Sequence, residues 1–199
     1  MTDKRLPLII RRAFEEDAAV LADLGRKTFE TAFGPDNDPF DLQAYLDISF
    51  STDQIAGELA DPDSTFLLAY HKRTLVGYAK LRKGSSPKGV TLRKPVQLSR
   101  LYITADHIGR GFGSQLIQAC FEESLRRGCE TMWLGVWEKN LRAQRLYERF
   151  GFVRVGTKPF VLGSDVQQDA VYEKSLGDIH HFHGQRSYHE RDTETRDSI

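Results

Sequence analysis

The sequence predicts one α+β domain, and three observations support that prediction. The chain has 199 residues, of which 40% are hydrophobic and 28% are charged, which suits a single domain with a buried core. Apolar runs typical of buried strands, at residues 96–103 and 131–137, alternate with stretches of helical periodicity. Between the first of these strands and an amphipathic stretch, residues 108–114 place three glycines within five positions.

The first sixty residues predict a short strand followed by three helices. Residues 8–11 form the strand, and residues 15–33 carry apolar side chains near helical spacing until a Gly-Pro pair ends the helix. An Asp-Pro pair, which supplies an N-cap and a first-turn proline, begins a second helix over residues 38–50. A Ser-x-x-Gln capping box opens the third helix over residues 51–60.

The remainder of the chain alternates between strands and helices. A loop rich in Gly, Ser, Pro and Lys, residues 84–95, separates a hairpin from the central strand. Both later helices end at a glycine, which readily adopts the backbone conformation of a helix C-terminus. We expect strands at residues 66–70, 75–81, 96–103, 131–137, 152–162 and 167–176, and helices at residues 111–127 and 141–150.

The glycine turn at residues 108–114 predicts a binding site for a phosphorylated cofactor. A helix N-terminus presents unpaired N–H groups and a partial positive charge, and glycines allow a ligand to approach the backbone closely. The turn is not a P-loop, which needs Lys followed by Ser or Thr where Ser114 and Gln115 stand. It also lacks the third glycine of the dinucleotide fingerprint, whose position Ser114 occupies. A tight strand-to-helix turn without a ligand is the alternative.

A second motif lies downstream, where a buried strand leads to Asn140 and then to a short helix. Its pattern is Asn140-x-x-Ala143-x-x-x-Tyr147-x-x-x-Gly151-Phe152. Together with the glycine turn, this pattern resembles motifs A and B of the GNAT-type N-acetyltransferases. The resemblance covers roughly residues 8 to 176 of the chain.

Part of the chain is similar to a narrower group within that family. The run at residues 133–140 resembles the PaiA-type polyamine N-acetyltransferases, as do residues 33–45 and 163–169 more loosely. One departure is visible at Ile108, where motif A of the family usually begins with Gln or Arg. That position contributes its backbone more than its side chain, so pyrophosphate binding is still implied.

The resemblance implies the GNAT fold, an α+β domain whose mixed central sheet is splayed between strands 4 and 5 and flanked by helices on both faces. It also implies acetyl-CoA as co-substrate and no metal, with pantetheine pairing with the main chain of Leu101, Tyr102 and Ile103. A β-bulge in that strand would free an N–H to stabilise the thioester oxyanion. The residues whose N–H groups would hold the pyrophosphate are Gly109, Arg110, Gly111, Phe112, Gly113 and Ser114.

Three side chains receive roles from the resemblance. Tyr147 would act as a general acid beside the sulfur, since a phenol with a pKa of about 10 can protonate the departing thiolate. A half-buried core tyrosine is the alternative. Asn140 would bind the pantetheine amides, cap the following helix, or do both. Arg110 would add charge for the pyrophosphate or face solvent.

The proton acceptor is harder to assign. An alkylammonium has a pKa of about 10.4, so it must lose a proton before its nitrogen attacks. Many GNAT enzymes place a Glu on the central strand for this step, whereas Gln97 and Ser99 hold the alternate positions here. A water relay to Glu30 is the assignment that remains, and Glu138 is an equal alternative.

Charge is unevenly distributed along a chain whose net charge is zero. Residues 28–71 contain nine acidic residues and no Lys or Arg, which leaves 19 acidic and 28 basic residues elsewhere. This block either attracts a polycation or caps and solvates helices. The resemblance implies that the acceptor binds at the first two helices and the loop between them, where this acidic block falls. We therefore expect a small primary amine as acceptor, a polyamine such as spermidine or spermine. Four rings in or beside the block would pack its methylene chain or belong to the core, namely Phe29, Phe33, Phe40 and Tyr45.

Two other functions fit the same motifs. A protein N-terminal or lysine acetyltransferase needs an open groove instead of a closed acidic pocket. A non-catalytic CoA-binding sensor needs no base, although Tyr147 favours an enzyme. The zero net charge argues against general nucleic-acid binding, and the sequence leaves the oligomeric state open, a homodimer included.

Location and domain limits follow from composition. No apolar stretch approaches the ~20 residues that span a bilayer, and no signal peptide is evident, so we expect a cytoplasmic protein without a membrane partner. Cys120 and Cys129 are about 13.5 Å apart along one predicted helix, which indicates reduced thiols. We divide the chain into an acetyltransferase domain, residues 1–176, and a polar His-containing tail, residues 177–199. The tail matches no zinc pattern, so we expect it to be disordered or loosely docked.

Overall fold

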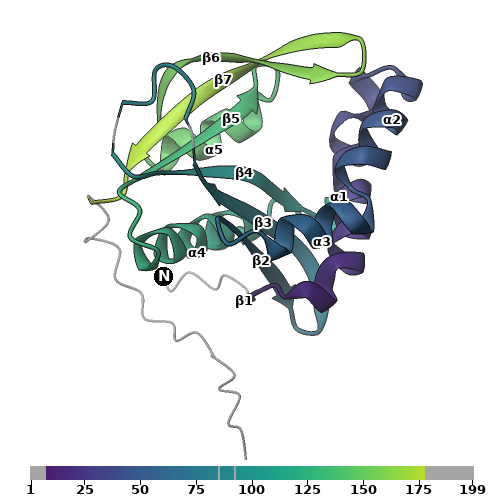
Figure 1. Ribbon diagram of the computed structural model, residues 1–199, viewed down its shortest axis with the longest axis horizontal. Helices are drawn as coiled ribbons and strands as arrows, with labels where there is room; N and C mark the ends of the chain where they lie inside the picture. The colour runs from purple at the N-terminus through teal and green to yellow at the C-terminus, as the bar shows by residue number, and fades with distance from the viewer. Residues whose placement is uncertain (1–7, 85, 92, 178–199) are drawn as a thin grey trace, which may run out of the picture.

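A seven-stranded mixed sheet forms the centre of the computed structural model, which describes residues 8–84, 86–91 and 93–177 (Figure 1). The strand order is β1-β2-β3-β4-β5-β7-β6, and in the described part of the chain only β4 and β5 pair in parallel. The strands are β1 (Ile9–Arg12), β2 (Ser64–His71), β3 (Thr74–Lys83), β4 (Pro95–Ile103), β5 (Thr131–Trp137), β6 (Val153–Leu162) and β7 (Asp165–Ser175).

Helices cover both faces of this sheet, as expected. The α-helices are α1 (Ala18–Phe33), α2 (Pro39–Ser49), α3 (Thr52–Ala60), α4 (Phe112–Arg126) and α5 (Leu141–Arg149), with short 3₁₀ turns at Glu15–Asp17, Gly34–Asp36 and Ala105–His107. One core joins α1, α2 and α3 to the sheet through Leu21, Leu46 and Ile55. The other core joins α4 and α5 to the opposite face through Leu116 and Tyr147. Figure 1 shows α1, α2 and α3 grouped together and α4 apart from them.

Local side-chain bonds explain where the early helices begin. The Asp38 carboxylate accepts the N–H groups of Phe40 at 2.9 Å and Asp41 at 3.2 Å, which confirms it as the N-cap of α2. Ser51 accepts the Gln54 N–H at 3.1 Å and so caps α3. The Gln54 side chain bonds to Glu58 at 3.2 Å, so it does not complete the expected capping box.

The sheet splits between β4 and β5, as the resemblance implied. These strands pair only at Pro95–Thr131, Val96–Met132 and Gln97–Trp133. Beyond that point β4 continues beside β3 alone, and β5 continues beside β7 alone. The two separated edges therefore retain backbone groups that pair with no strand of the described chain.

A β-bulge lies at the start of the separated part of β4. Lys80 pairs with Arg100 and Leu81 pairs with Leu98, so Ser99 is the extra residue on β4. The Ser99 hydroxyl donates to the Lys80 carbonyl at 3.2 Å. Residues three apart on a regular strand face opposite sides of the sheet, yet Leu98 and Leu101 both pack on the α4 side. The extra residue at the bulge accounts for this change in side-chain direction.

The C-terminal tail, membrane spans, metal clusters and cysteines complete the account of the fold. Apart from Gly177, the tail at residues 177–199 lies outside the described residues, and so do four of the chain's histidines. Within the described residues, no helix is long and apolar enough to cross a membrane, and no group of His, Cys, Asp and Glu side chains is arranged to hold a metal ion. Cys120 and Cys129 are both buried free thiols.

Candidate active site

The glycine turn connects β4 to α4, and its backbone conformation requires glycine. Gly109 and Gly111 have φ angles of +87° and +79°, a left-handed region that other residues rarely adopt. Gly111 is the N-cap of α4, and the first helical hydrogen bond runs from the Gln115 N–H to the Gly111 carbonyl at 3.2 Å. The N–H groups of Phe112, Gly113 and Ser114 therefore have no acceptor inside the helix, which makes this terminus suitable for a phosphate group.

Burial fixes the start of α4 without covering the turn. Phe112 is 1% exposed, and its ring centroid lies 5.2 Å from that of His71 and 6.0 Å from that of His107. Gly109 and Arg110, just before it, are exposed. The buried ring holds the helix start in place, while the turn in front of it stays open to a ligand.

The free edge of β4 lies close to this turn. Leu101, Tyr102 and Ile103 belong to the part of β4 that β5 no longer pairs with. A Cβ atom built on Gly113 would lie 3.9 Å from Ile103 Cγ1 and 3.8 Å from Leu146 Cδ2. The two sequence motifs therefore meet in space, and Ile103 of the free strand edge lies beside them. An extended ligand arm could pair with that edge as an added strand does.

Asn140 has the structural role that the sequence left open. Its side-chain Oδ1 accepts the Ala143 N–H at 3.1 Å, so it is the N-cap of α5. This bond uses only the carbonyl oxygen of the amide, and the NH₂ group keeps its two donors. Capping and binding of a ligand are therefore compatible for this residue.

Tyr147 lies about two helical turns after Asn140 on α5 and is 8% exposed. Its ring packs edge-on against Phe152, with centroids 5.7 Å apart, and belongs to the core beneath the splayed strands. Its hydroxyl has no hydrogen-bond partner among the described residues. Burial, with a smaller contribution from the nearby Cys120 thiol, raises the pKa of Tyr147 well above its ordinary value. The group is therefore a protonated donor throughout the physiological pH range.

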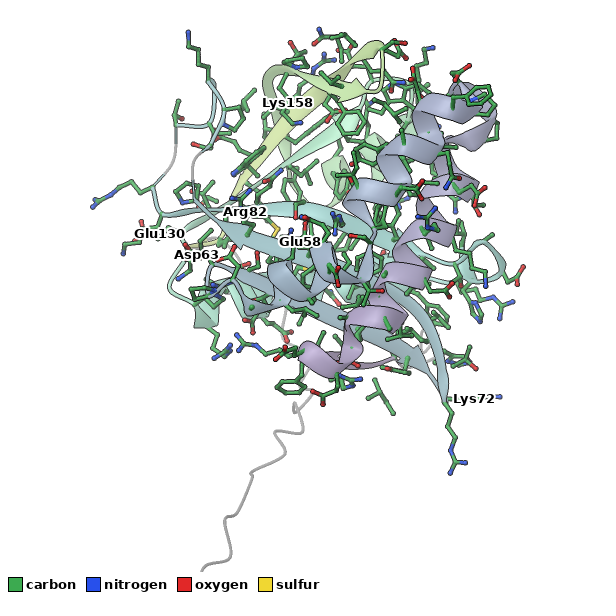
Figure 2. The ribbon with its side chains drawn as sticks, turned by 45° about the vertical axis from the view of Figure 1, so that its right-hand side comes forward. Glu58, Asp63, Lys72, Arg82, Glu130 and Lys158 are labelled. Carbon is green, nitrogen blue, oxygen red and sulfur yellow. The ribbon has the colours of Figure 1, made fainter. Side chains whose placement is uncertain are left out.

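An ion pair with a buried carboxylate and a partly exposed lysine lies on the opposite face of the split. The Asp169 carboxylate of β7 is 8% exposed and binds Lys158 Nζ of β6 at 3.1 Å. A Cβ atom on Gly135 would lie 2.9 Å from Asp169 Oδ2 and 2.6 Å from Lys158 Cε, so the pair covers the β5 backbone where a side chain is missing. Figure 2 shows Lys158 on the β6–β7 hairpin. The sequence analysis did not single out either residue.

Aromatic residues lie beside this ion pair, since Lys158 Nζ is 6.0 Å from the centroid of Phe160 and Trp137 pairs in register with Asp169. The centroids of Phe33 and Trp137 lie 6.0 Å apart, and those of Tyr45 and Phe160 lie 5.7 Å apart. Phe29 is 4% exposed and belongs to the core, whereas Phe40 is 87% exposed on α2. Of the four predicted rings, Phe33 and Tyr45 are partly exposed and pack against the core.

Most acids of the block at residues 28–71 have structural partners. Asp38 caps α2, Asp47 pairs with Arg26 at 2.5 Å, and Asp61 accepts the Asp63 N–H at 3.0 Å. Glu58 and Asp41 have partners described below. Four carboxylates of the block have no hydrogen-bond or ion-pair partner in the described part of the chain, namely those of Glu30, Asp36, Asp53 and Asp63. Only these four remain available to form the predicted cation-attracting rim.

The candidate bases differ in their surroundings. Glu30 is exposed on α1, one turn before Phe33, and no hydrogen bond or ion pair engages its carboxylate within the described residues. Glu138 pairs with the Arg154 guanidinium, which competes with any proton it would accept. Gln97 lies at the last β4–β5 pair, and Ser99 occupies the bulge, so neither supplies a carboxylate.

A charge cluster under the bulge was missed by the sequence analysis. Glu58 of α3 binds Lys80 Nζ at 2.8 Å and Arg100 Nη1 at 2.8 Å, and all three side chains are at most 13% exposed. Burial alone would raise the pKa of Glu58, but the two cations outweigh it and hold that pKa below its ordinary value. Figure 2 shows Glu58 where α3 meets the sheet. The cluster ties α3 to the bulged segment of β4.

The tip of the β6–β7 hairpin is fastened to α2. The Asp41 carboxylate accepts the Ser164 N–H at 2.9 Å and its hydroxyl at 2.7 Å. Gln167 donates to Asn37 at 2.6 Å just beside it. Figure 1 shows the hairpin reaching the end of α2. These bonds close one side of the space between the hairpin and the first two helices.

Comparisons with known proteins show the family to which the chain belongs. The model of the Acetyltransferase (GNAT) family matches residues 26–152, a span that contains both motifs. An uncharacterised N-acetyltransferase from the 3′ region of pepI in Lactobacillus delbrueckii subsp. lactis is 32% identical over 162 residues, which make up 81% of this chain and 94% of that protein.

Two further similarities concern narrower groups. The spermine/spermidine N(1)-acetyltransferase of Bacillus subtilis (strain 168) is 30% identical over 84 residues, covering 42% of this chain and 55% of that protein. The crystal structure of a PaiA N-acetyltransferase from Thermoplasma acidophilum in complex with coenzyme A has a TM-score of 0.68 at 18% identity, and covers 85% of this chain and 99% of that chain. This structural similarity shows a shared fold.

Proposed function

Because this chain belongs to the GNAT family of acetyltransferases, we propose that it transfers the acetyl group of acetyl-CoA to a primary amine of a small cationic acceptor, a polyamine. The observation that carries this proposal is the separation of β4 from β5 after three residue pairs, next to a helix start that is open to phosphate. The catalytic unit would be residues 1–176. The two buried free thiols fit a reducing compartment, the cytoplasm.

The residues around the split fit the donor. Its pyrophosphate would be held by the N–H groups from Gly109 to Ser114, where charge and geometry both favour an anion. Its pantetheine arm would pair with the free edge of β4 from Leu101 to Ile103, with further bonds from the Asn140 amide. No step of the proposed reaction uses a metal ion.

The reaction would be a direct transfer between two bound substrates. The amine first gives up its ammonium proton to water, directly or by a relay to Glu30, and its nitrogen attacks the thioester carbon. A C–N bond forms and the C–S bond breaks, and the sulfur takes a proton from the Tyr147 hydroxyl. Tyr147 regains that proton from solvent as the acetylated nitrogen loses its remaining extra proton. A main-chain N–H near the Ser99 bulge would stabilise the oxyanion, an effect worth about 2.7–4 kcal/mol in other enzymes.

The acceptor side supports a small amine over a protein. The hairpin tip is bonded to α2 through Asp41 and Ser164, which closes the groove that a polypeptide would need. The rings of Phe33 and Tyr45 suit methylene chains and cations. The similarity to a spermine/spermidine acetyltransferase over part of the chain points to the same class of acceptor.

A panel of amines tests the proposal. Purified protein and acetyl-CoA are mixed with spermidine, spermine, putrescine, free lysine and peptides that carry a lysine or a free N-terminus, and the release of CoA thiol is followed. We expect turnover with the polyamines and little with the peptides. Turnover confined to peptides would favour a protein acetyltransferase. Tight CoA binding without turnover of any amine would favour a sensor.

A further inference from the structure

The Asp169–Lys158 ion pair lies at the edge of the split in the sheet. Trp133 is the last residue of β5 that pairs with β4, and Gly135 follows two positions later. Met132, Leu134 and Val136 pack in the α4 core, so the alternate residues of β5 face the side of α1 and α2. Asp169 pairs in register with Trp137 and therefore faces that side as well. Its carboxylate thus borders the place where the acetyl donor and the acceptor would meet.

Gly135 lets the carboxylate reach this position. Any larger residue there would place its Cβ 2.6 Å from Lys158 Cε and 2.9 Å from Asp169 Oδ2, which is closer than real Cβ contacts. An isolated glycine among the bulky residues of a central strand commonly marks such a close approach. The ion pair therefore lies directly against the β5 backbone beside the split.

The carboxylate keeps binding capacity after pairing with Lys158. Lys158 Nζ engages Oδ2 at 3.1 Å, and Oδ1 has no partner among the described residues. A carboxylate offers about four acceptor positions, so a second cationic donor can be accommodated. Oδ1 is not one of the fully buried side-chain atoms that lack a hydrogen-bond partner in the described chain, so water or a ligand amine can reach it.

The rings beside the ion pair limit what can bind. Lys158 Nζ is 6.0 Å from the Phe160 ring centroid and Trp137 pairs in register with Asp169, so a carbon chain bound beside the carboxylate would meet apolar surface. Lys158 places a positive charge beside Asp169. A second ammonium group of the ligand would therefore be repelled if it lay close to this lysine. The rest of a polyamine would then extend outward, toward the partner-free carboxylates of Glu30 and Asp36 near Phe33.

We propose that Asp169 binds the amine nitrogen that becomes acetylated, and that Lys158 restricts the site to the terminal amine of an extended chain. This inference rests on the proposed function and deepens it, since it names the residue that orients the acceptor over the split. The Asp169 Oδ1 atom accepts a hydrogen bond from the amine. Lys158 competes for the same carboxylate and thereby lowers the affinity for the acceptor.

The two members of the pair should therefore have opposite effects. Asp169→Asn should raise the KM of the preferred amine, with spermidine as the probe, by about tenfold or more, because a hydrogen bond to a charged group is lost. Lys158→Met keeps the methylene stem and removes the competing charge, so it should lower the same KM. The Kd of acetyl-CoA, measured by calorimetry, should stay within about twofold in both variants. Asp165→Asn is the matched control, since it makes the same change at an exposed position on the same strand.

The outcomes separate this inference from the proposed function. If the original protein binds acetyl-CoA but turns over no amine, the proposed function fails. If it turns over amines and Asp169→Asn has the KM of the Asp165→Asn control, the inference is wrong and the function stands. A purely structural ion pair predicts that both variants raise KM together and that the double variant restores it. If Asp169→Asn does not fold, Lys158→Met decides, since a lower KM supports the inference and a higher one overturns it.

Discussion

Replacing Tyr147 with Phe removes one hydroxyl from the core between α5 and the sheet. The ring packs against Phe152 at a centroid distance of 5.7 Å, and a Phe side chain keeps that contact. The Tyr147 hydroxyl has no hydrogen-bond partner among the described residues, so its removal breaks no hydrogen bond within them. We expect Tyr147→Phe to change the free energy of unfolding by less than about 1 kcal/mol.

The same change should remove the proton donor of the reaction. A positioned general acid contributes about 10²- to 10⁴-fold to a rate. The lower limit corresponds to about 2.7 kcal/mol of activation free energy, since each factor of ten is worth about 1.36 kcal/mol. Burial raises the pKa of Tyr147 far above neutrality, so the hydroxyl remains protonated. The rate of the original enzyme should therefore show no loss from ionisation of this group between about pH 7 and pH 9.

Thiol release under steady-state conditions gives kcat, and thermal unfolding gives the stability of each variant. Tyr172→Phe is the matched control, because Tyr172 is also buried but its hydroxyl bonds to Glu148 at 3.0 Å and Gln144 at 3.4 Å. The control should lose about 1 kcal/mol of stability and keep its kcat. A Tyr147→Phe enzyme whose kcat stays within about threefold of the original would refute the general-acid assignment.

Three further predictions concern the turn, the charge cluster and the hairpin. Gly111→Ala forces a side chain into a left-handed conformation at a cost of about 1–2 kcal/mol, and calorimetry should show weaker CoA binding; unchanged affinity would contradict the pyrophosphate site. Glu58→Gln should lower the free energy of unfolding by about 3 kcal/mol, because two buried cations lose their carboxylate. The pKa of Glu58 is lowered in the folded state, so its stabilisation is complete above the unfolded value of about 4.3 and disappears as the pH falls through the folded value. Urea unfolding at a series of pH values should show that acid-side loss in the original protein and less of it in Glu58→Gln. Asp41→Ala removes both bonds to Ser164, so amide exchange at the hairpin tip should accelerate and the amine KM should rise, while an unaltered exchange rate would count against the fastening.

Local sequence signals were sufficient for most of the secondary structure. The strand over residues 131–137 has the predicted bounds, and the N-caps of α2 and α3 are the predicted residues. The first helix begins three residues later than expected, because Glu15–Asp17 forms a 3₁₀ turn instead. Caps, glycines and apolar spacing act over a few residues, so they can be read directly from the chain.

Long-range ion pairs could not be predicted in the same way. Glu58 and Arg100 are 42 positions apart, and Asp41 and Ser164 are 123 positions apart, so their contacts depend on the finished packing. The acidic block was thus interpreted as one surface, although several of its members bind internal partners. One signal for the Asp169 site was present in the sequence, since Gly135 interrupts a strand of bulky residues. The sequence alone does not show that β7, which carries Asp169, lies beside Gly135, so the glycine could not be assigned to this site.

Among the described residues, only three residue pairs join the two parts of the sheet, β1 to β4 on one side and β5 to β7 on the other. This narrow seam makes the split the weakest point of the hydrogen-bonded layer. A ligand that bonds to both free edges would bridge the parts like an inserted strand, and at 100 times its Kd it would add about 2.7 kcal/mol of stability. Binding of the co-substrate would therefore also stabilise the fold of the protein that consumes it.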